Sequence, residues 1–146
     1  MLRSVVLAGA AAVAVATVTV PSVPVDAAPV GQPVVIVAHT DFTVEASEFD
    51  STLDGCESGT VINSSGGPHF TPKGGTYAGL KEFTCDDGES GFSIRLTARF
   101  GPNGSTGTWT LADGWGDFAG LKGSGSLVGI ISSDTIIDDT YTGTVR

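Results

Sequence analysis

Four aromatic side chains lie where this sequence could hold a small molecule, in or beside its glycine-rich turns: Tyr77, Trp109, Trp115 and Phe118. Aromatic rings at the mouth of a barrel can line a pocket for an apolar or sugar ligand. The alternative is that they only pack in the core, because side chains usually fill the interior of a small barrel. Trp115 is the hardest to explain by packing, since a tryptophan in a turn exposes a large apolar area. We therefore predict these four residues as ligand-binding.

Hydrolytic and metal chemistry have less support. His39 and His69 are the only histidines, and the G-x-S-x-G pattern is absent, because residues 103–107 (NGSTG) place asparagine at the first glycine position. The acidic groups in 86–89 and 134–139 could supply oxygen ligands to calcium, but solvated turns have the same composition. We expect no metal and no cofactor.

The two cysteines, Cys56 and Cys85, are far apart and form no C-x-x-C motif. In a chain bound for an oxidising space, a disulfide is the expected state, and a pair of redox thiols is the alternative. Closing a loop of this length would stabilise the fold by roughly 3.6 kcal/mol in the chain-entropy model.

The N-terminus has the layout of a secretory signal peptide. MLR is a short basic start, residues 4–20 are apolar, and small residues at Val25 and Ala27 fit a cleavage site after Ala27. The alternative, a permanent membrane anchor, would need roughly 20 apolar residues. We therefore expect a signal peptide over 1–27, an extended lead-in over 28–38, a domain over 39–146, and a secreted, extracellular protein without a membrane segment after cleavage.

The charge of the chain excludes one class of partner. The net charge is −9, and it is unchanged by cleavage, which removes one residue of each sign. Nucleic acids and anionic lipids are bound mainly through cationic side chains, so we expect no nucleic-acid partner.

Hydrophobic residues alternate along the chain with a period of two. In residues 92–100 (FSIRLTARF) apolar and polar side chains alternate throughout, which predicts a strand with one buried face. Further strands are expected at 40–49, 58–64, 80–85, 106–112, 124–131 and 140–146, separated by Gly-, Asp- and Ser-rich turns. About eight short antiparallel strands predict an all-β fold, a single small barrel, with a β-sandwich as the alternative.

An internal repeat supports the barrel. GTYAGLK (75–81) is nearly repeated as GDFAGLK (116–122). In each copy the aromatic residue and the leucine are three apart, so a tight helical turn would place both on one face. We expect two related halves in which the same turn plugs the barrel twice, with Lys81 and Lys122 pointing outward.

The segment GTWTLADGWGDFAGLKGSGSL (107–127) resembles the strand-turn-strand signature of the allene oxide cyclase-like barrels, a group that includes dirigent proteins. The matching positions are Gly114, Gly116, Phe118, Gly120, Gly123 and Gly125. The resemblance implies an eight-stranded antiparallel barrel with a central cavity, often in oligomers, whose enzymes act on apolar molecules. No catalytic segment of the group aligns with this chain.

Three functions are consistent with these observations. We expect a barrel without enzymatic activity that binds a small apolar or aromatic ligand, or a partner, at one end. The alternatives are a dirigent-like or cyclase-like enzyme acting in a cavity, and a packed structural or cell-surface interaction protein. A cavity with polar groups would favour the enzyme, an apolar cavity the binding protein, and no cavity the interaction protein.

Overall fold

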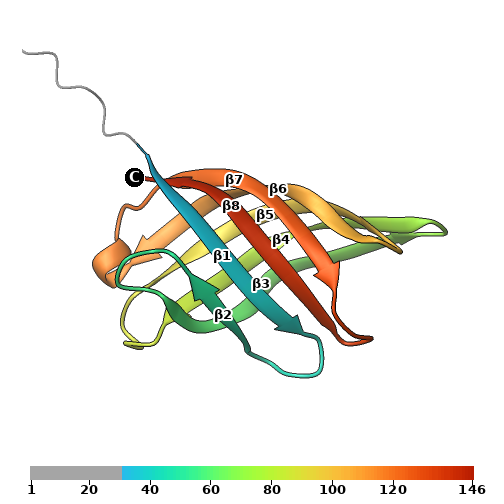
Figure 1. Ribbon diagram of the computed structural model, residues 1–146, viewed down its shortest axis with the longest axis horizontal. Helices are drawn as coiled ribbons and strands as arrows, with labels where there is room; N and C mark the ends of the chain where they lie inside the picture. The colour runs from blue at the N-terminus through green and yellow to red at the C-terminus, as the bar shows by residue number, and fades with distance from the viewer. Residues whose placement is uncertain (1–30) are drawn as a thin grey trace, which may run out of the picture.

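In the computed structural model, which describes residues 31–146, the chain forms one closed antiparallel barrel (Figure 1). Each strand pairs with its neighbours in the sequence, and the first strand also pairs with the last. One short 3₁₀ helix, η1 (Gly116–Phe118), interrupts the order. The strands are β1 (Gln32–Asp41), β2 (Ser47–Ser51), β3 (Ser58–Thr71), β4 (Gly74–Cys85), β5 (Gly91–Gly101), β6 (Gly104–Trp115), β7 (Gly123–Ile131) and β8 (Ile136–Val145).

The expected eight-stranded barrel is confirmed, and the sandwich alternative is excluded because the pairing of β1 with β8 closes the sheet on itself. The alternation in β5 has the expected effect: Ile94 and Leu96 are buried, whereas Arg95 and Thr97 are exposed. In residues 31–146 no helix is long and apolar enough to cross a membrane.

The barrel begins earlier than the sequence indicated. Residues 32–38, assigned to the lead-in, belong to β1, where Val34 and Ile36 point into the core. The expected strand over 40–49 is also wrong, because a turn divides it. The side chain of Asp41 accepts hydrogen bonds from the Thr43 backbone N–H and hydroxyl and so supports this turn. The expected signal peptide over 1–27 lies outside the described residues.

The repeated heptad does not build the same structure twice. Residues 75–81 lie inside β4, which pairs with β3 and β5 along its length. Only the second copy, 116–122, contains a turn, η1, and places Phe118 in the core. The first copy stays extended because β3 does not end near residue 64, as expected, but continues through Gly66 and Gly67 and gives residues 75–80 a strand partner. Figure 1 shows the β3–β4 and β5–β6 hairpins projecting beyond the other strands.

One end of the barrel is closed by covalent and aromatic contacts. The disulfide Cys56–Cys85 is confirmed and ties the loop after β2 to the end of β4, with a Cα–Cα distance of 5.1 Å. Buried rings then fill the interior in a continuous series, each within 6.5 Å of the next between centroids. In order, this series consists of Phe118, Phe92, Phe49, Phe83, Tyr141 and Trp109. The core at this end is therefore packed with rings, and a second, more polar hollow of about 740 Å³ lies beside η1, between the end of β6 and the end of β8.

Candidate ligand-binding cavity

The other end of the barrel holds a cavity of about 500 Å³. It lies where the loops between β1 and β2, β3 and β4, β5 and β6, and β7 and β8 gather, because its lining comes from the residues next to these loops. Its size is within the usual range of about 300–1,000 Å³ for small-molecule sites. The interior of this barrel is thus filled at one end and hollow at the other.

The cavity walls are mainly apolar. Inward-pointing residues of the strands, Leu96, Ala98, Leu127 and Ile137, form the sides. Aromatic side chains surround the mouth, and two of them are largely exposed: Phe42 is 63% and Phe70 73% exposed. Phe70 also meets Phe100 edge to face at 5.6 Å between ring centroids. Exposed rings around an apolar hollow are unusual in an isolated domain and suit the entry of an apolar molecule.

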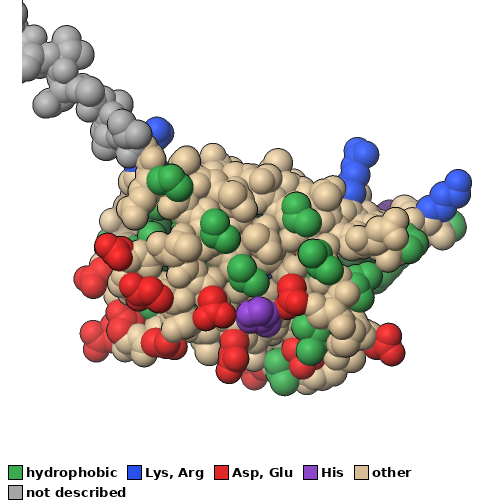
Figure 2. Space-filling view, viewed as in Figure 1, with side chains coloured by type: hydrophobic (Ala, Val, Ile, Leu, Met, Phe, Trp, Pro, Cys, Tyr) green, Lys and Arg blue, Asp and Glu red, His purple; other side chains and the backbone are tan. Residues whose placement is uncertain are grey.

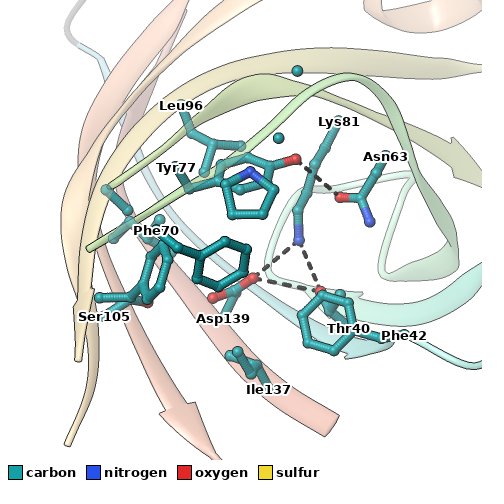
Figure 3. Close-up of a pocket in the computed structure, with 16 residues that line it drawn as sticks. Thr40, Phe42, Asn63, Phe70, Tyr77, Lys81, Leu96, Ser105, Ile137 and Asp139 are labelled. Atoms are coloured by element: carbon teal, nitrogen blue, oxygen red, sulfur yellow. Dashed lines mark hydrogen bonds and ion pairs between the residues drawn. The ribbon is translucent and has the colours of Figure 1, made fainter. Parts of the chain in front are cut away.

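A buried ion pair forms the floor of the cavity (Figure 3). Lys81 Nζ lies 2.9 Å from Asp139 Oδ2 and donates a second hydrogen bond to Thr40 Oγ1 at 2.8 Å. The side chains of Lys81 and Asp139 are only 4% and 12% exposed. Lys81 comes from β4, Asp139 from β8 and Thr40 from β1, so three strands hold the cluster in place. Because each charge has its partner, the floor carries no net charge.

The position of Lys81 corrects the sequence-based expectation that this lysine points outward. Lys81 is 3% exposed, whereas Lys122, at the equivalent position of the second copy, is exposed. The alternation of side chains along β4 could have predicted the inward position. Lys81 is two residues from the apolar Phe83 and therefore shares its inward face. Asp139 has the same relation to Tyr141 on β8. The acidic group at 134–139, interpreted as a solvated turn, thus includes one interior carboxylate.

Two tyrosines adjoin this charged floor. Burial raises the pKa of the Tyr77 hydroxyl, and the Asp139 carboxylate adds to the effect. Burial also raises the pKa of Tyr141 well above its ordinary value, with smaller contributions from Asp139 and Tyr77. The Tyr141 hydroxyl has no hydrogen-bond partner among residues 31–146, and the Tyr77 hydroxyl makes one long contact of 3.5 Å to Asn63. Both phenols are therefore neutral at physiological pH.

The structure does not bring the four predicted ligand-binding residues together. Only Tyr77 lines the cavity. Trp109 is 1% exposed within the aromatic core, and Phe118 closes the opposite end. The half-buried ring of Trp115 covers the backbone of Gly91, which has no side chain that would collide with it. Packing thus accounts for the tryptophan that the sequence left unexplained.

The outer surface carries a second polar cluster, away from the cavity. The exposed His39 on β1 lies between two carboxylates, with Nδ1 2.8 Å from Asp138 and Nε2 3.5 Å from Asp50. The hydrogen bond to Asp138 raises the pKa of His39 more than partial burial lowers it. A hydrogen bond from Ser132, together with His39, lowers the pKa of Asp138. Figure 2 shows acidic side chains spread over this part of the surface, and basic ones at the projecting hairpins.

In the part of the chain that the structure describes, no three histidine, cysteine or acidic side chains are grouped in a way that could hold a metal ion. Comparison of the sequence with protein-family models and curated proteins, and of the fold with solved structures, gave no significant match.

Proposed function

We propose that this protein binds a small, largely apolar molecule in the cavity at the open end of its barrel. The observation that carries the proposal is the cavity of about 500 Å³ with apolar walls, set in an interior that is otherwise packed. Native interiors are close-packed, and leaving a hollow in one forgoes dispersion contacts. A ligand that fills this hollow regains them. The same cavity disfavours the alternative of a fully packed interaction protein.

The proposal places the protein outside the cell. The buried disulfide is typical of proteins from oxidising compartments. Together with the signal-peptide pattern of residues 1–27, it supports a secreted protein that meets its ligand in the extracellular medium. Self-association is favoured by the outer face of β7, where Val128 and Ile130 are 48% and 61% exposed. Sedimentation velocity tests this self-association by measuring the mass of the particle in solution.

An enzyme of the cyclase-like or dirigent-like kind is the second candidate, and the ion pair at the cavity floor favours it. An ammonium group in a dry cavity can stabilise negative charge that develops on a bound oxygen. The resemblance of residues 107–127 to the allene oxide cyclase-like barrels supports the same candidate. The two functions differ in outcome: a binding protein releases its ligand unchanged, whereas an enzyme releases a product of different structure.

Blocking the cavity tests the proposal. Ala98 lines the cavity on β5, and the neighbouring Thr97 points outward on the same strand. Ala98→Phe should fill the space and abolish binding of phenylnaphthylamine, a neutral probe whose fluorescence rises in apolar surroundings. Thr97→Phe adds the same ring outside and should bind as the wild type does. If the wild type gives no saturable signal, or if folded Ala98→Phe binds equally well, the proposal is wrong.

A further inference from the structure

The ammonium group of Lys81 has an unused hydrogen-bond donor at the floor of the cavity. An ammonium carries three N–H donors, and Lys81 Nζ uses two of them, on Thr40 and Asp139. No third partner occurs among residues 31–146. Lys81 is 3% exposed. Figure 3 shows it among the residues that line the cavity. A buried donor without a partner costs free energy, so a ligand atom that accepts its hydrogen bond is favoured.

The charge of the floor limits what that atom can be. Lys81 and Asp139 are the only charged side chains that line the cavity in the described part of the chain, and they neutralise each other. A bound carboxylate would add a second negative charge beside Asp139, and a bound amine would add a second positive charge beside Lys81. Either charge would lose its water without a free partner, at a cost of several kcal/mol.

We propose that the ligand presents an uncharged oxygen, from a ketone, aldehyde, ester or alcohol, to Lys81 Nζ, and an apolar remainder to the cavity walls. This inference rests on the proposed ligand-binding function and defines its chemical class. The apolar part lies against Leu96, Leu127 and Ile137 and meets the aromatic mouth at Phe70. Ionised fatty acids and protonated amines are excluded as preferred ligands, although their hydrocarbon parts would fit the same walls.

Four naphthalenes of similar size, substituted at the same position, test the proposal by calorimetry: acetylnaphthalene, ethylnaphthalene, naphthoate and naphthylmethylamine. Acetylnaphthalene should bind the wild type about tenfold more tightly than ethylnaphthalene, the fold-change expected for one hydrogen bond from a charged donor. Naphthoate and naphthylmethylamine should bind more weakly than ethylnaphthalene. Equal affinities for all four, or a preference for a charged compound, would overturn the inference and leave the ligand-binding function intact. Binding of none would overturn both.

Variants of the floor give an independent test. Asp139→Asn leaves the Lys81 charge unpaired, so naphthoate should become the tightest of the four ligands. The double variant Lys81→Met/Asp139→Leu replaces the ion pair with apolar groups, a change that folded proteins often tolerate. It should lose the difference between acetylnaphthalene and ethylnaphthalene. Lys122→Met, the same substitution at the exposed lysine, should keep that difference. A double variant that still prefers acetylnaphthalene would show that another group makes the contact.

Discussion

Removing one partner of the Lys81–Asp139 pair should destabilise the barrel far more than removing both. In Lys81→Met, Asp139 loses its ion-pair partner at 2.9 Å while its side chain stays only 12% exposed. Hydrogen bonds to charged groups contribute about 1.5–3 kcal/mol each, and breaking a fully buried pair costs about 3–5 kcal/mol. Residual contact of the carboxylate with water reduces this loss, and we expect about 3 kcal/mol. Asp139→Leu should cost a similar amount because it leaves the ammonium alone.

The double variant Lys81→Met/Asp139→Leu should unfold within about 1 kcal/mol of the wild type, because apolar replacement of a buried pair is often neutral or stabilising. Urea denaturation followed by circular dichroism gives the four free energies of unfolding, and the double-mutant cycle gives the coupling energy. An isolated buried carboxylate is relieved by protonation, so the deficit of Lys81→Met should also shrink as the pH falls. Our interpretation of the floor would be refuted if the losses of the two single variants simply added in the double variant.

Three further predictions concern the closed end, the outer surface and the mouth. Cys56→Ser should lower the free energy of unfolding by roughly 3.6 kcal/mol without changing the far-UV spectrum, and an unchanged urea midpoint in oxidising buffer would contradict a stabilising disulfide. His39 has a pKa raised above 6.5, so the stability that its charged form contributes is fully present below pH 6.5 and lost as the pH rises through the raised value. The stability difference between wild type and His39→Gln should therefore be larger at pH 5 than at pH 8, and equal differences would exclude this effect. Phe118→Ala should cost about 3–4 kcal/mol because its ring is 8% exposed. Phe70→Ala, at 73% exposure, should cost less than about 0.5 kcal/mol yet weaken binding of phenylnaphthylamine, and the opposite order would show that the two barrel ends are assigned wrongly.

The sequence predicted the fold through signals that are local. The alternation in residues 92–100 corresponds to β5, and the Gly- and Asp-rich segments between strands mark several of the turns. The disulfide was predictable because the signal-peptide pattern of residues 1–27 indicates export, and two cysteines of an exported chain usually pair. Closure into a barrel followed from the need of a short antiparallel chain to bury one face of each strand.

The repeat and the site were predicted poorly because they depend on contacts that are distant in sequence. The two heptads are alike in composition, but β3 pairs with the first, whereas no strand among residues 31–146 pairs with the second. The first is therefore extended and the second contains a turn. The charge of Lys81 predicts an outward side chain, whereas the alternation of inward and outward residues along β4 places it on the inner face. Its partner Asp139 lies on β8 at the far end of the sequence, and no local pattern connects the two.

The most direct test of the central claim is native mass spectrometry of the mature wild type and of Ala98→Phe, each incubated with an apolar extract of the culture medium. We predict a neutral adduct of small-molecule mass on the wild type that disappears on unfolding and is absent from Ala98→Phe. Identical masses for the two folded proteins would contradict a ligand-binding cavity at the open end of this barrel.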